Sequence, residues 1–234
     1  MTRPIWQRYL AVIAYLIIAL ALSYIFGTIL SLILQEVSPN SISSPQQISP
    51  RIMLYMLLCQ MFAFLLPVPY LMYFCHSEPL PIFQGNPFSG LFCMGIVFLT
   101  LITFGLIYER LGVKPEQLKF LDKNSILAEK FYFLLATVVF APFYEEYVFR
   151  GVIFKALYQE RKLVQVIPAA LVNMISFTLM HKEGAFNAIV LIPIFVLSLI
   201  FSYFAYTRQS LMPSIMGHMF QNLLASMQFF VEIK

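Results

Sequence analysis

The sequence predicts an all-α protein, a polytopic bundle of transmembrane helices. Of the 234 residues, 60% are hydrophobic and only 11% are charged, whereas a soluble domain carries about 25% charged residues. The uncharged runs are long enough to cross roughly 30 Å of hydrocarbon as helices. They are rich in Leu, Ile, Phe and Met and do not alternate between apolar and polar residues, which argues against a transmembrane β-barrel.

The uncharged runs predict seven spans. The Pro-, Ser-, Asn- and Gln-rich segment 36–51 cannot continue a span and is expected to form an aqueous loop. The fourth span is the longest, contains charged residues and is expected to be tilted or broken near Pro142. In chain order, the predicted spans cover about 9–33, 53–75, 88–108, 128–158, 163–181, 186–206 and 212–231.

One membrane domain, 1–234, is the simplest predicted organisation. The polar intramembrane groups lie mostly after residue 140, so 1–126 is interpreted as scaffold spans and 127–232 as the functional core. The charged stretch before Lys130, which includes Leu118, is expected to lie at the membrane interface. The net charge of +4 comes without a long basic stripe, so the lipid bilayer is the expected partner and nucleic acid is not.

The fourth span is interrupted by Glu145, Glu146 and Arg150. Charged groups at the centre of a span cost roughly 2.5 to 3.5 kcal/mol each, so a compensating interaction is expected. Glu146 and Arg150 are four residues apart on one helical face, which predicts an ion pair. Glu145 points about 100° away, where Pro142 opens space for water. The alternative is that all three side chains reach the headgroup boundary.

Two histidines and an amide lie on later spans. His181 follows Phe177 by one turn, and His218 shares a helical face with Asn222. With Glu145 they suit hydrolysis: the carboxylate takes a proton from water, His181 positions that water, and His218 with Asn222 stabilises an oxyanion. Ligation of Zn²⁺ by Glu145, His181 and His218 is an alternative, although the HExxH motif is absent. His181 also fits a purely structural group at the end of its span.

Three motifs now resemble those of one family, the CPBP intramembrane proteases, which include CAAX-type prenyl-protein endopeptidases and Abi-like bacterial proteins. EEYVFR at 145–150 resembles the family motif EExxxR, FTLMH at 177–181 resembles FxxxH, and HMFQN at 218–222 resembles HxxxN. The resemblance covers about 130–230. It implies a helical bundle with an intramembrane polar cavity and commonly eight spans, so about seven to eight helices are expected.

The resemblance also implies residue roles. Glu145 corresponds to the catalytic glutamate, His181 to its partner, and His218 and Asn222 to the groups that stabilise the oxyanion. Glu146, Arg150 and Phe177 match the remaining motif positions, for which we expect structural support of the site.

The leading hypothesis is therefore an intramembrane endopeptidase that acts on a peptide or protein substrate near the surface of a bacterial cell membrane. A proton- or ion-coupled transporter is a second hypothesis, because ionisable residues inside spans also mark ion pathways. A non-catalytic membrane scaffold or immunity protein is a third. Asn173 is expected to form a hydrogen bond between helices.

Overall fold

The computed structural model describes residues 3–37, 50–112, 127–181 and 188–227. All regular elements in these ranges are helices, so the predicted all-α fold class is confirmed. The interfacial residue Leu118 and most of the predicted loop 36–51 lie outside the described residues. The α-helices are α1 (Ile5–Val37), α2 (Pro50–Leu65), α3 (Val68–Cys75), α4 (Phe88–Leu111), α5 (Leu127–Leu134), α6 (Ala141–Glu146), α7 (Lys155–Leu157), α8 (Leu163–Met180), α9 (Ala188–Arg208) and α10 (Met212–Met227).

Six helical stretches among the described residues are long and apolar enough to cross a membrane. They coincide with the first six predicted spans and indicate an integral, multi-pass membrane protein. The seventh predicted span, 212–231, corresponds to α10, whose described part has only 16 residues. The second span contains a break, because α2 ends at Leu65 and α3 begins at Val68. Pro67, at the N-cap of α3, lacks the backbone N–H that would continue the helix.

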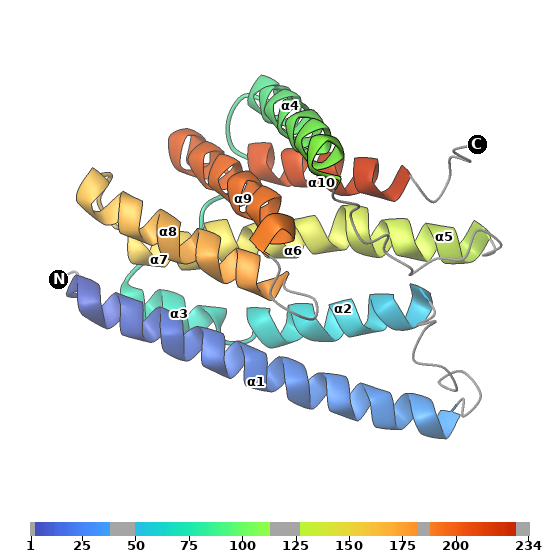
Figure 1. Cartoon of the computed structure of the whole chain (residues 1–234). Coiled ribbons are helices and arrows are strands. Elements are labelled where there is room, and N and C mark those ends of the chain that lie inside the picture. Colours follow the sequence, from blue (N-terminus) through green and yellow to red (C-terminus); the bar gives the residue numbers. More distant parts are fainter. Residues whose placement is uncertain (1–2, 38–49, 113–126, 182–187, 228–234) are drawn as a thin grey trace.

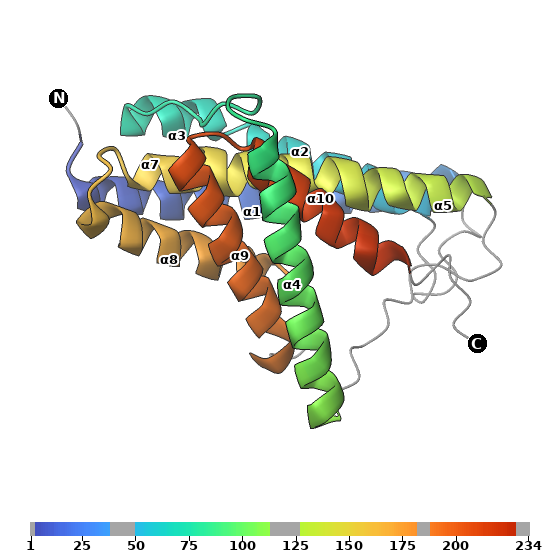
Figure 2. The same ribbon diagram turned by 90° about the horizontal axis from the view of Figure 1, so that it is seen from above.

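The fourth span forms a long rod through the molecule. Of the tilt or break expected near Pro142, a break is not found, because the helical elements are continuous there. Instead, α5, α6 and α7 are joined by two π-helical segments, η2 (Leu135–Phe140) and η3 (Tyr147–Phe154). We call this continuous stretch, Leu127–Leu157, the central rod. Figure 1 shows α1, α2 and α3 on one side of the rod and α4, α9 and α10 on the other. In Figure 2, α4 and α9 run at a steep angle to the rod.

Three apolar cores lie among the described helices. The largest joins α1, α2, α3, the rod and α8, and a second joins α4 and α9 with Phe220 of α10 packed against it. The third includes Leu211 and Ile215, and Phe143 and Tyr147 of the rod pack against it. Large apolar side chains also cover the outside, where Phe62 is 68% exposed and Val164 is 75% exposed. Such extensive apolar exposure is expected where lipid replaces water as the solvent.

Candidate active site

The two glutamates of the first motif lie on α6, between the two π-helical segments. The π-helical hydrogen-bond pattern begins before Pro142. The backbone N–H of Ala141 donates to the carbonyl of Ala136, five residues earlier. The next residue in this pattern, Pro142, has no N–H to donate to the carbonyl of Thr137. π-helical turns of this kind are frequent at functional sites.

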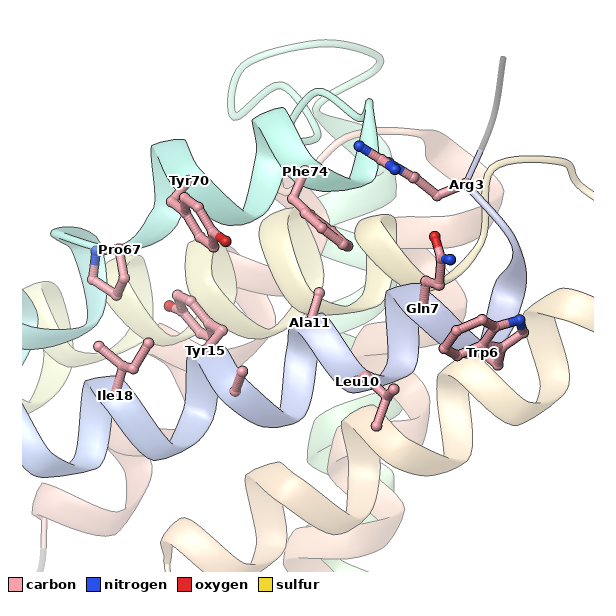
Figure 3. Close-up of a pocket in the computed structure, with 11 residues that line it drawn as sticks. Arg3, Trp6, Gln7, Leu10, Ala11, Tyr15, Ile18, Pro67, Tyr70 and Phe74 are labelled. Atoms are coloured by element: carbon pink, nitrogen blue, oxygen red, sulfur yellow. The ribbon is translucent and has the colours of Figure 1, made fainter.

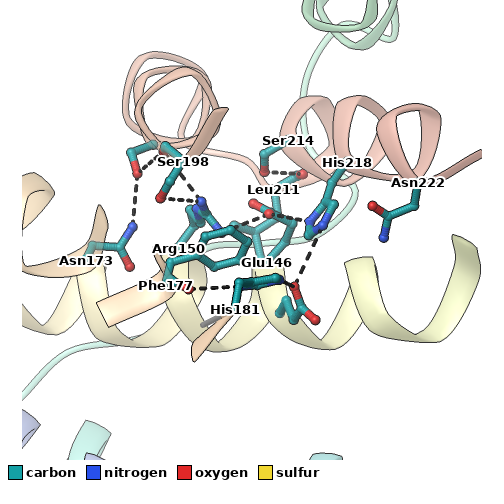
Figure 4. Close-up of polar contacts among 12 residues, drawn as sticks. Glu146, Arg150, Asn173, Phe177, His181, Ser198, Leu211, Ser214, His218 and Asn222 are labelled. Carbon is teal, nitrogen blue, oxygen red and sulfur yellow. Dashed lines mark hydrogen bonds and ion pairs between the residues drawn. The ribbon is translucent and has the colours of Figure 1, made fainter. Parts of the chain in front are cut away.

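Asn222 of α10 supplies the missing donor. Its Nδ2 donates to the backbone carbonyl of Thr137 at 2.8 Å, so the carbonyl that Pro142 leaves without an intrahelical donor is satisfied by another helix. In Figure 4, Asn222 lies on the same helix as His218, with its amide directed toward the rod. The described contacts therefore give Asn222 a structural partner, and its second Nδ2 hydrogen remains for another acceptor.

The predicted ion pair between Glu146 and Arg150 is confirmed. Nη1 of Arg150 lies 2.9 Å from Oε1 of Glu146, and both side chains are completely buried. Because both side chains are buried inside the protein, neither extends along its surface as a side chain reaching for the headgroup boundary would. Nη2 of Arg150 donates to Oγ of Ser198 on α9 at 2.8 Å. The sequence interpretation missed Ser198, which stands in an apolar run with Ser202 one turn later as its only signal.

Aromatic rings and a small polar network enclose the guanidinium. Arg150 Cζ lies 4.2 Å from the centroid of the Phe177 ring and 5.4 Å from that of Phe201, and these aromatic faces favour a cation that has lost its water. Asn173 donates to Oγ of Ser202 at 3.0 Å. This bond joins α8 to α9, as predicted for Asn173.

His218 is fixed by Glu146 and Phe201. Its Nδ1 lies 2.9 Å from Oε1 of Glu146, and its ring stacks on Phe201 with centroids 5.2 Å apart. Because the Glu146 carboxylate is an acceptor, Nδ1 of His218 is the donor in this bond. Nε2 then points the other way and lies 3.7 Å from Oε2 of Glu145.

His181 is fixed in a parallel manner by its own helix. Its Nδ1 lies 2.8 Å from the carbonyl oxygen of Phe177, and a carbonyl only accepts, so this nitrogen also donates. Nε2 of His181 lies 3.4 Å from Oε2 of Glu145. The ring thus lies beside a carboxylate on the rod, which is compatible both with the catalytic role and with a structural group at the end of its span.

A close helix crossing places His218. A Cβ atom on Gly217 would lie only 2.6 Å from Sγ of Cys93 on α4, and one on Gly90 of α4 would overlap Met216 of α10. Reciprocal glycines therefore let α4 and α10 approach each other more closely than larger residues would allow. The residue after Gly217 is His218, so the close approach of α4 and α10 helps to position the imidazole.

Figure 4 shows how the motifs meet. The structure brings Glu145, His181 and His218 together, with Glu146, Arg150 and Phe177 packed directly behind them. Oε2 of Glu145 is buried and has no hydrogen-bond partner among the described residues. An orphaned carboxylate oxygen beside two imidazole nitrogens is an acceptor site for a proton donor.

The alternative of a Zn²⁺ site gains no support. Among the described residues, no group of three or more His, Cys, Asp and Glu side chains has the arrangement of a metal site. We therefore derive no step through a metal.

Residues 127–224 match the family model described as type II CAAX prenyl endopeptidase Rce1-like. The match extends from the first residue of α5 into α10 and covers all three motifs. It confirms the resemblance to CPBP intramembrane proteases. Neither a curated protein nor a solved structure matches the chain.

Proposed function

We propose, from the premise that residues 127–224 resemble a CAAX-type endopeptidase domain, that the protein hydrolyses a peptide bond of a peptide or protein substrate within the membrane. The family match supports an intramembrane endopeptidase of this type. The observation that carries the mechanism is the buried Oε2 of Glu145, which has no hydrogen-bond partner within the described ranges and lies beside Nε2 of both His181 and His218.

Hydrogen-bond directions support one position for the attacking water. Because Nδ1 of His181 donates to Phe177, the neutral ring presents a bare lone pair at Nε2. That lone pair and the Glu145 carboxylate are both acceptors, so a molecule with two donor hydrogens satisfies both. A water molecule that donates to Glu145 and His181 keeps a lone pair on its oxygen, directed at the substrate.

The charge of the buried cluster favours one additional proton. Glu145 and Glu146 carry two negative charges and Arg150 carries one positive charge, so one additional proton makes the group neutral. Neutrality is strongly favoured in a low-dielectric interior. The candidates for that proton are Glu145 and the two imidazoles. When Nε2 of His218 carries it, this atom becomes a donor for an oxyanion, with Glu146 balancing the charge from the opposite side of the ring.

In the proposed reaction, the water oxygen attacks the carbonyl carbon of the scissile bond while one water proton passes to Glu145. The carbonyl oxygen becomes an oxyanion and accepts hydrogen bonds from Nε2–H of His218 and from the second Nδ2 hydrogen of Asn222. Collapse of this intermediate breaks the C–N bond, and the proton on Glu145 passes to the leaving nitrogen. The products are a carboxylic acid and an amine.

Mass spectrometry tests the reaction class. Purified protein in liposomes is mixed, in ¹⁸O-labelled water, with a C-terminal CAAX peptide in farnesylated and unmodified forms. Hydrolysis places one ¹⁸O atom in the new carboxylate. We expect labelled product from the wild type and from Glu109→Gln, an exposed glutamate at the end of α4, but none from Glu145→Gln. Substrate-dependent proton or solute flux without cleavage would support a transporter instead, and equal cleavage by Glu145→Gln would overturn the assigned mechanism.

A further inference from the structure

A cavity of about 490 Å³ lies between α1 and α3, outside the candidate active site. We call it the α1–α3 groove. Figure 3 shows Arg3 and Gln7 at one end, with Ile18 and Pro67 at the other. From Gln7 to Ile18 the helix rises about 16 Å, which is close to the thickness of one leaflet of a bilayer core of roughly 30 Å.

Small side chains on α1 create the hollow. Ala11 and Ala14 line it, where a larger residue would fill the space between the two helices. Tyr15 also lines the groove, and its hydroxyl donates to the carbonyl of Phe64 at 2.7 Å. The buried hydroxyl of Tyr15 is therefore already paired. The exposed Tyr70 places a second hydroxyl beside it (Figure 3), and the other side chains in the middle of the groove are apolar.

The end near the N-terminus of α1 has the opposite character. Arg3 contributes a cation, whose Cζ lies 4.9 Å from the centroid of the Phe74 ring, and it forms no ion pair with another described residue. Oε1 of Gln7 is buried without a hydrogen-bond partner among the described residues. Trp6, which is 60% exposed, is typical of the membrane–water interface. This end therefore presents a positive charge and an unsatisfied acceptor at the depth of lipid headgroups.

We propose that the α1–α3 groove binds an anionic glycerophospholipid whose headgroup carries a hydroxyl, of which phosphatidylglycerol is the simplest example. The phosphate binds Arg3, a headgroup hydroxyl donates to Oε1 of Gln7, and one acyl chain lies along Ala11 and Ala14. Phosphatidylcholine fits less well, because its headgroup has no net negative charge and no hydrogen to donate to Gln7.

The groove is separate from the site of hydrolysis. It lies outside the segment 127–224 that matches the endopeptidase family. Its floor at Tyr15 is backed by Phe64, whose ring packs edge-on against Tyr144 with centroids 6.0 Å apart. This packed layer stands between the groove and the rod, so the occupant is a lipid and not the substrate at the catalytic residues.

Native mass spectrometry of the detergent-purified full chain tests this proposal. Phosphatidylglycerol, phosphatidylcholine and glycerol 3-phosphate are titrated separately, and the bound fraction is measured. We expect one tightly held phosphatidylglycerol, weaker phosphatidylcholine binding and no displacement by glycerol 3-phosphate. Arg3→Gln should weaken phosphatidylglycerol binding about fivefold. Gln7→Leu should reduce the preference for phosphatidylglycerol over phosphatidylcholine.

Steric variants provide the second arm. Ala14→Leu fills the groove and should abolish the tightly held lipid, whereas Ala21→Leu, an exposed position outside the groove on the same helix, should leave it bound. Arg110→Gln removes an exposed charge from α4 and controls for general electrostatic attraction. Retention of phosphatidylglycerol by Ala14→Leu, or equal binding of both lipids by the wild type, would overturn the proposal. Displacement of the lipid by the CAAX peptide would identify the groove as a substrate site instead.

Discussion

Nδ1 of His218 lies 2.9 Å from Oε1 of Glu146, although 72 residues separate them in the chain. Through this contact the two consecutive glutamates take different tasks. Glu146 holds His218 and Arg150 from behind, while Glu145 faces the outward nitrogens of His218 and His181. Glu146 thus pairs with Arg150 of the rod and also orients His218 of α10.

Breaking the buried ion pair should be costly. Arg150→Met leaves Glu146 buried without its cation, and we expect a loss of about 3 to 5 kcal/mol in the free energy of unfolding. The double variant Glu146→Gln with Arg150→Met should be more stable than Arg150→Met alone, because no charge is left uncompensated. Unfolding in mixed micelles measures both, with exposed Arg208→Met as the control. Equal stability of the single and double variants would contradict the pairing.

Asn222 and Pro142 should be coupled through the carbonyl of Thr137. Asn222→Ala leaves that carbonyl without its donor and should cost about 1 to 3 kcal/mol of stability. Pro142→Ala restores a backbone N–H, so the double variant should regain stability. The cleavage rate separates the two roles of Asn222. If the double variant is stable but cleaves slowly, Asn222 also stabilises the oxyanion. Full recovery of the cleavage rate would show that Asn222 acts only as a structural donor.

The crossing of α4 and α10 predicts a steric effect on His218. Gly217→Ala brings a Cβ to within 2.6 Å of Sγ of Cys93, and overpacking of this kind costs about 1 to 3 kcal/mol. Cleavage should fall as the imidazole moves. Adding Cys93→Ala removes the nearest atom and should restore part of both the stability and the rate. Gly95→Ala on α4, where an added Cβ meets nothing within 4 Å, serves as the control. No effect of Gly217→Ala would show that this contact does not position His218.

His181 should be required for the rate and much less for stability, because its ring makes one bond to its own helix at Phe177. We expect His181→Ala to slow cleavage at saturating substrate by about 10²-fold or more, with a small change in melting temperature. His76→Asn is a suitable control, since His76 caps α3 with φ of 50° and Asn tolerates that conformation. Cleavage at the wild-type rate by His181→Ala would remove this residue from the mechanism.

Local spacing predicted a large part of the site. The four-residue interval from Glu146 to Arg150 predicted their ion pair, because helical geometry fixes which side chains share a face. The separation of Glu145 from that face predicted different partners for the two glutamates. The isolated polar Asn173 in an apolar span predicted an interhelical bond, which the structure shows to Ser202.

Contacts between distant helices were not predictable in this way. The bond from His218 to Glu146 depends on how α10 crosses the rod, and the donation from Arg150 to Ser198 depends on the tilt of α9. The local structure at Pro142 was not predictable either. A tilt or a break was expected. The structure shows no break: the chain forms π-helical turns, and Asn222 of another helix donates to the carbonyl of Thr137. Local sequence does not identify that donor.

The most direct test of the central claim compares Glu145→Gln with Glu146→Gln in single-turnover cleavage of the same peptide, with the unfolding of each variant measured alongside. Glu145→Gln keeps the shape of the side chain but cannot take a proton from water. It should abolish cleavage while the protein stays folded, whereas Glu146→Gln should act mainly by lowering stability. Wild-type single-turnover rates from folded Glu145→Gln would contradict the proposal that this carboxylate activates the water.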